Sequence, residues 1–211
     1  MGISRRFVFT VSILGATAVI LATLTLRPVF LAISVRNDIA KISKGHFDEG
    51  QLRQWAARHH GVVTCHEGQC EGSVYIPNSL LHSLHLAPLT RFNAEVDIVD
   101  NRPVRSTLSI SDVQYLGRAS GATTMVVVEY ESSRYSEPVG DLLVRDVPKG
   151  KLQFRLYAVT PQSSRQAIAR AFKINVWCLA RIGGCPQSQQ APDIWVLPPT
   201  PIRPFPTASS R

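Results

Sequence analysis

Residues 7–26 decide the layout of this chain: they read FVFTVSILGATAVILATLTL and contain no charged side chain. A helix rises about 1.5 Å per residue, so a helix of this length matches the roughly 30 Å hydrocarbon core of a lipid bilayer. Arg27 and Pro28 interrupt the apolar run. We therefore expect residues 7–26 to form a transmembrane helix with the lipid bilayer as its partner.

Three interpretations of this run compete: an uncleaved signal anchor, a cleaved signal peptide, and a buried helix of a soluble protein. The small-x-small site Ala16-Thr17-Ala18 would leave an apolar new N-terminus after cleavage, which disfavours a signal peptide. A second apolar stretch, residues 29–35, is too short to span a bilayer. We expect it to lie at the membrane surface or to continue the helix of a signal anchor.

The charges beside the run give conflicting indications of orientation. Residues 1–6 form a short basic leader with Arg5 and Arg6 and no acid, which is the pattern that export machinery reads. A strict count of Lys and Arg on the two flanks favours the reverse orientation. We favour an inside N-terminus and an extracytoplasmic C-terminal domain. The short leader and the Arg-rich, Lys-poor composition favour a bacterial inner membrane with the domain on its periplasmic side.

The remainder of the chain has the composition of one mixed-charge domain. Residues 1–36 carry four arginines and no acid, so they supply half of the net charge of +8. No run of five like charges follows, and we expect no nucleic-acid partner. Length and composition predict a juxtamembrane segment over residues 27–47, one α+β domain over 48–185 and a Pro-rich tail over 186–211.

Alternating apolar and polar residues predict a small antiparallel β-sheet, packed with one or two helices, after the transmembrane helix. The expected strands are 62–64, 73–76, 92–99, 104–110, 124–131, 141–147 and 151–160, with a short edge strand at 193–197. The expected helices are 48–61, 78–86 and 161–173. The residues after 173 either continue the last helix or form a strand, because Ile174, Val176, Cys178 and Ala180 alternate with other residues. Asp48 is a suitable N-cap for the first helix, and Gly61 can end it in a left-handed conformation. Thr160 or Ser163 can cap the last helix, and Ser163 with Gln166 fits a capping box.

The four cysteines form two local pairs, Cys65 with Cys70 and Cys178 with Cys185. An even number of cysteines in a chain with an export signal favours disulfides. Four cysteines allow three pairings, and we favour the two local ones because each pair flanks a predicted turn.

Histidines near these cysteines raise the alternative of a metal site. Zinc prefers thiolate and imidazole ligands, but the cysteine spacing does not match a zinc finger, and free thiolates need a reducing compartment. We favour no metal and no other cofactor. The weak candidate ligands are His59, His60, His66, His82 and His85, of which the last two lie three residues apart on a predicted helix.

The Pro-rich tail is a second candidate for binding, because a polyproline II segment fits an aromatic-lined groove on a partner protein. The residues expected to make such contacts are Pro198, Pro199, Pro201, Arg203 and Pro204.

Signature motifs of several common enzyme classes are missing from the sequence: G-x-S-x-G, H-E-x-x-H and G-x-G-x-x-G do not occur. We favour a non-catalytic, single-pass envelope protein whose domain binds a protein or an envelope component. One alternative is a membrane-tethered hydrolase in which His59, His66, His82 or His85 converge in one pocket. Another is a cytoplasm-facing zinc-binding domain with reduced cysteines.

An N-terminal apolar helix, a β-sheet and a C-terminal cysteine loop resemble a type IV pilin-like subunit in layout. The resemblance implies assembly of many copies, which is a further alternative. The glycine-phenylalanine processing site and the glutamate five residues into the mature helix, which such subunits carry, are absent here.

Overall fold

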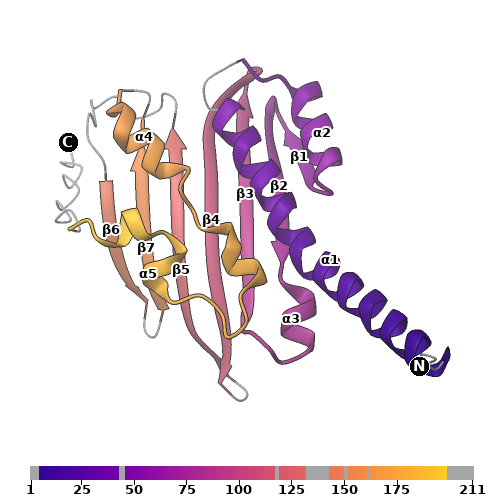
Figure 1. Ribbon diagram of the computed structural model, residues 1–211. Coiled ribbons are helices and arrows are strands. Elements are labelled where there is room, and N and C mark those ends of the chain that lie inside the picture. Colours follow the sequence, from indigo (N-terminus) through magenta and orange to yellow (C-terminus); the bar gives the residue numbers. More distant parts are fainter. Residues whose placement is uncertain are drawn as a thin grey trace, which may run out of the picture.

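The computed structural model describes residues 5–42, 46–116, 119–131, 143–149, 152–160 and 162–198. These residues build one seven-stranded sheet in the order β1-β2-β3-β4-β5-β7-β6 (Figure 1). Neighbouring strands are antiparallel, except β5 and β7, which run parallel because β6 takes the edge position and β7 returns between them. The strands are β1 (Val62–His66), β2 (Gln69–Pro77), β3 (Leu89–Val99), β4 (Arg102–Leu116), β5 (Ala119–Glu131), β6 (Leu143–Lys149) and β7 (Leu152–Val159).

The helices of the described residues include one long N-terminal element and several short ones, so the predicted α+β fold class is confirmed. They are α1 (Arg5–Ile42), α2 (Glu49–Arg58), α3 (Ser79–Ser83), α4 (Arg165–Ala171), the 3-10 helix η1 (Val176–Ala180), α5 (Gln187–Gln190) and α6 (Pro192–Trp195).

Two short turns set the register of the first hairpins, and in both of them consecutive residues adopt left-handed backbone conformations. Glu67 and Gly68, with φ of 47° and 80°, connect β1 to β2, and Asp100 and Asn101, with φ of 51° and 59°, connect β3 to β4. Positive φ at both central residues is typical of a type I′ turn, whose twist suits antiparallel strands. The second turn is shorter than the four residues expected from the sequence, because β4 already begins at Arg102.

Helix α1 continues past Arg27 and Pro28 to Ile42, which is one of the two expectations for residues 29–35. A proline inside a helix removes one backbone hydrogen bond. Here the residues that follow it pack on the sheet, and four of them are fully buried on one face of the helix: Val29, Ala32, Val35 and Ile39. Burial of this stripe explains why the proline does not end the helix.

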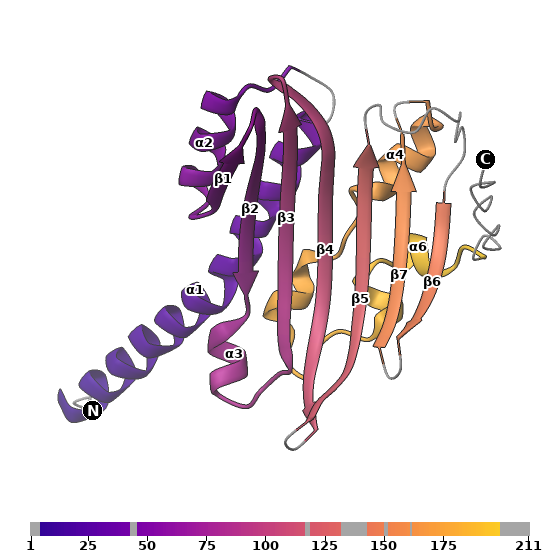
Figure 2. The ribbon, with the colours of Figure 1, turned by 180° about the vertical axis from the view of Figure 1, so that it is seen from behind.

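The N-terminal half of α1 projects beyond the sheet (Figures 1 and 2). Its apolar side chains are exposed, with Leu14 at 65% and Val19 at 67% of their full accessible area. Within the described residues α1 is long and apolar enough to cross a membrane.

Helix α2 begins as predicted, with a complete capping box between Asp48 and Gln51. Its buried residues Leu52 and Trp55 pack against the sheet beside Gly72, where a Cβ would lie 2.6 Å from Leu52 Cδ1. The predicted stop at Gly61 is wrong: His60 takes the left-handed conformation, with φ of 57°. Gly61 is needed for another reason, since a Cβ there would collide with the backbone carbonyl of Ser73.

The C-terminal third differs most from the sequence-based expectation. Ser164 caps α4 by accepting a hydrogen bond from the backbone N–H of Ala167 over 3.1 Å, whereas the predicted cap Ser163 accepts one from the backbone N–H of Thr160. Helix α4 ends at Ala171, and the 3-10 helix η1 follows over Val176–Ala180 after a short connection, so residues 174–180 form neither a strand nor a continuation of α4.

Residues 193–197 do not form the predicted edge strand, because they lie in and just after α6. Arg155 Nη1 donates to the backbone carbonyl oxygens of Ile194, Trp195 and Leu197 at 3.0, 2.8 and 3.0 Å, and its guanidinium lies 4.5 Å from the Trp195 ring centroid. The segment 186–198, expected to belong to an exposed tail, therefore packs on the domain.

The helices gather on one side of the sheet, so the two faces of the sheet differ (Figures 1 and 2). On the helix side, β3 contributes Phe92, Ala94, Val96 and Ile98, all at most 2% exposed. The opposite side is seen directly in Figure 2, and no described helix lies over its strands.

Candidate functional site

On the side of strands β1 to β4 that no described helix covers lie the mostly polar residues that alternate with the buried ones. We call this surface the open face. Its rows of directly opposed residues are His66–Gln69–Val99, Thr64–Glu71–Asp97–Arg105, Val62–Ser73–Glu95–Thr107, Tyr75–Asn93–Ser109 and Arg91–Ser111.

Charged side chains of the open face gather around one ion pair. Arg105 Nε donates to Asp97 Oδ2 over 2.7 Å. Glu71 lies opposite Asp97 on the neighbouring strand, and Glu95 lies two residues before Asp97 on the same face. Three carboxylates therefore share a small area of the sheet.

Burial and the neighbouring carboxylates together affect the acidity of Glu95. Partial burial is the main cause that raises the pKa of Glu95, and the negative charges of Glu71 and Asp97 raise it further, while Arg105 opposes them. A cationic group placed over the cluster would relieve this repulsion. The open face therefore has the electrostatic character to attract Lys or Arg side chains of a partner.

A hollow of about 480 Å³ borders the acidic row beside the β1–β2 hairpin. Its walls combine polar and apolar side chains, among them His66, Glu71, Asp97 and Val104. A hollow of this mixed character can receive a side chain of a binding partner.

An aromatic residue lies farther along the same face. Tyr75 is 53% exposed, and the Arg91 guanidinium carbon lies 5.8 Å from its ring centroid. Tyrosine and arginine are enriched at protein–protein interfaces, because each combines a large contact area with polar groups. Tyr75 lies within a predicted strand and Arg91 lies just before one, and the pattern of strands did not indicate that the two side chains share a surface.

The predicted histidine candidates lie on different elements. His59 is the C-cap residue of α2 and is 3% exposed, and its Nε2 lies 2.9 Å from Asp38 Oδ2 on α1. This contact ties α2 to α1, which is a structural role that the sequence did not indicate. His60 is exposed just after α2, and His66 is exposed at the end of β1.

His82 and His85 do not share a helical face, contrary to the prediction. Helix α3 ends at Ser83, and His85 follows it with a left-handed φ of 54°. His82 is half-buried and His85 is exposed.

Within the described residues, the group of potential metal ligands that comes together is Glu49, Cys65 and Cys70. The two sulfur atoms in it are bonded to each other, so neither is available as a thiolate. The residues do not fit a zinc site.

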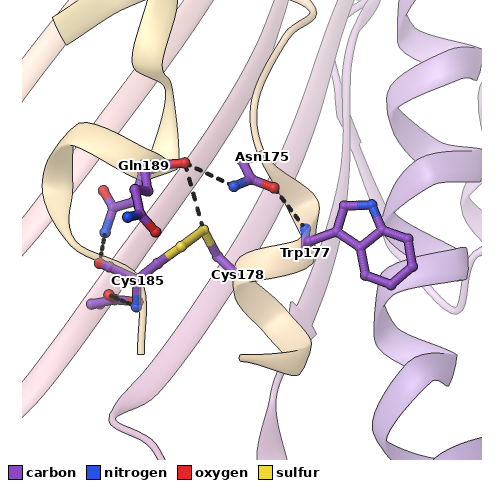
Figure 3. Close-up of a disulfide and its surroundings, with 7 residues drawn as sticks. Asn175, Trp177, Cys178, Cys185 and Gln189 are labelled. Atoms are coloured by element: carbon purple, nitrogen blue, oxygen red, sulfur yellow. Dashed lines mark hydrogen bonds between the residues drawn. A yellow bond between two sulfur atoms is a disulfide. The ribbon is translucent and has the colours of Figure 1, made fainter. Parts of the chain in front are cut away.

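Both predicted disulfides are present. Cys65–Cys70 joins directly opposed residues of β1 and β2, and Cys178–Cys185 closes the loop after η1 (Figure 3). Asn175 supports the second loop by donating from Nδ2 to the Gln189 carbonyl over 2.9 Å.

Asp112 links the second disulfide loop to the sheet. Its carboxylate is 5% exposed, and Oδ2 accepts a hydrogen bond of 3.3 Å from the backbone N–H of Cys185. Burial raises the pKa of Asp112, although hydrogen bonds from Thr90, Cys185 and Gln190 oppose the shift. The group is enclosed by the fold and has no access for a ligand.

The tail residues predicted to bind a partner are largely outside the described residues. Pro198 is described and exposed, whereas Pro199, Pro201, Arg203 and Pro204 lie beyond the described range.

Comparison of the chain with protein-family models, with curated proteins and with solved structures found no match. The site is therefore characterised by its geometry and chemistry alone.

Proposed function

We propose that this chain is a single-pass membrane protein whose disulfide-bonded domain lies outside the cytoplasm and binds a protein partner through the open face. The observation that carries the binding proposal is an uncovered sheet face with an acidic cluster, an exposed tyrosine and an adjoining hollow. The partner that fits it is a protein with a basic patch.

The membrane part of the proposal is supported by α1. Its exposed apolar half extends away from the domain, and the described domain residues do not bury it. Disulfides persist mainly in oxidising compartments, so two of them favour an extracytoplasmic domain.

Membrane attachment and orientation are tested on freshly isolated membranes. We expect the chain to resist extraction by alkaline carbonate, and its four cysteines to react with an alkylating mass tag only after reduction. Release by carbonate would contradict the anchor. Reaction of all four thiols without reductant would place the domain in the cytoplasm.

Binding is tested by introducing a photo-crosslinking amino acid at Tyr75 in the full chain in cells. The control position for the crosslinker is Val196, which is also exposed, at 80%, but lies after α6 and away from the open face. We expect a protein adduct from position 75 and none from position 196. Equal adducts at both positions, or none at either, would refute binding through the open face.

Charge variants show whether the acidic cluster contributes. We expect the double variant Glu71→Gln/Glu95→Gln to lose the adduct at position 75. The control Glu49→Gln/Asp193→Asn removes the same charge from places outside the open face and should retain it. Loss of the adduct in both variants would show an effect of net charge alone.

A further inference from the structure

We propose that the end of the domain beside the departing half of α1 rests on the surface of the bilayer. The contact is made by four exposed apolar residues, Leu84, Leu86, Trp177 and Ile182, which we call the exit surface. This inference rests on the membrane anchoring proposed above and adds a second contact with the same membrane.

The distance along α1 places the domain close to the bilayer. The apolar run ends at Leu26, and the first fully buried residue of α1 is Val29, about 4.5 Å farther along the helix axis. No flexible linker separates the two, because α1 is continuous. A domain joined in this way meets the membrane surface at the end from which α1 departs.

Two loops form that end and are held together. The backbone N–H of Gly183 donates to the carbonyl of Leu86 over 2.7 Å, and a Cβ at Gly184 would lie 2.5 Å from Pro88 Cγ. The Cys178–Cys185 disulfide closes the second loop. Helix α3, which precedes the first loop, contacts α1, as does η1, which precedes the second.

These loops expose apolar side chains that the domain does not cover. The exposed fractions are 50% for Leu84, 43% for Leu86, 54% for Trp177 and 68% for Ile182. Trp177 points from η1 toward α1 (Figure 3). Tryptophan, like tyrosine, is enriched at the membrane–water interface, where the ring lies against apolar groups while its N–H is solvated.

Charge at this end suits anionic phospholipids. Segments 1–37, 78–94 and 174–186 contain no Asp or Glu, and Arg27 and Arg181 are exposed there. Arginines next to an apolar surface bind headgroup phosphates while their carbon chains remain in the apolar layer.

A hollow follows α1 from its exposed apolar half to the part that packs on the domain. It measures about 650 Å³, and its walls are mostly apolar, with Val19, Leu26 and Phe30 from α1 and His60 from the end of α2. A lipid chain fits this hollow, whereas a second protein domain would have to replace lipid around a membrane-spanning helix. The bilayer is therefore the occupant that we infer for the exit surface.

The test uses the full chain in vesicles of phosphatidylethanolamine and phosphatidylglycerol that carry bromine near the headgroup end of the acyl chains. The chain has three tryptophans, of which Trp55 is 3% exposed and Trp195 stacks on Arg155. We expect bromolipid to quench the tryptophan fluorescence, Trp177→Phe to remove most of this quenching, and the control Trp195→Phe to retain it. Quenching that persists in Trp177→Phe would overturn the inference.

A second measurement distinguishes lipid from a second copy of the chain. A photo-crosslinking amino acid at Ile182 should give phospholipid adducts, and one at Val196 should give none. An adduct between two chains at position 182, without lipid adducts, would overturn the inference in favour of self-association. Carbonate extraction separates the two proposals: release refutes the anchor, whereas retention with an unquenched Trp177 refutes the exit surface alone.

Discussion

The substitution Ile39→Ala tests whether the second half of α1 belongs to the folded domain. Ile39 is fully buried between α1 and the sheet. The change removes three carbon atoms, and at about 0.8 kcal/mol for each the lost burial is about 2.4 kcal/mol. The cavity left behind adds to this, so we expect the free energy of unfolding to fall by about 3 kcal/mol, within the usual range for Ile→Ala.

The control is the same substitution on the same helix at Ile20, which is 58% exposed and lies in the apolar half. Both variants are unfolded by urea in detergent micelles as full-length chains, with tryptophan fluorescence as the signal. Ile20→Ala should leave the domain transition where it is. If Ile39→Ala also left the transition unchanged, residues 29–42 would be a linker and the packing argument would be refuted.

Three further changes have defined outcomes. Cys178→Ser/Cys185→Ser should lower the free energy of unfolding by about 2.5 kcal/mol, as expected for a short cross-linked loop, and reductant should have no further effect on that loop. Burial raises the pKa of Asp112, so the stability that its protonated form contributes is present at low pH and is lost as pH rises from about 4 through the folded-state pKa. Asp112→Asn should flatten this part of the pH–stability curve in urea titrations, and an unchanged curve would contradict the assignment. Gly61→Ala should cost about 1–3 kcal/mol in the same assay, because its Cβ collides with the Ser73 carbonyl and neither backbone can move freely.

Local patterns in the sequence were sufficient to predict most strands of the sheet. Phe92, Ala94, Val96 and Ile98 alternate with polar residues, and only one face of β3 can then be buried. The helix after Asp48 was also predictable, because a capping box is formed by residues three positions apart. The two disulfides join near neighbours, so their pairing required no knowledge of the tertiary structure.

Features that depend on distant contacts were not predictable. A single sequence does not show that residues 29–42 pack against the sheet. This packing is the reason that α1 continues beyond Pro28. Residues 193–197 contain a short run of apolar residues that favours a strand, but Arg155 binds three carbonyl groups there and stabilises a helical turn instead. The open face likewise requires the register of the strands, since Glu71 of β2 becomes a neighbour of Asp97 of β3, and Asp97 a neighbour of Arg105 of β4, only in the folded sheet.

The continuity of α1 couples the two parts of the chain. The helix that is apolar enough to cross a membrane also supplies Val29, Val35 and Ile39 to the core, so removing all of residues 1–42 would remove part of the domain. Loss of folding after such a deletion would therefore say nothing about membrane anchoring. Cleavage at Ala16-Thr17-Ala18 would leave Val19, Ile20 and Leu24 exposed on the helix. An intact helix in a bilayer covers these side chains, and for that reason the arrangement favours an uncleaved anchor.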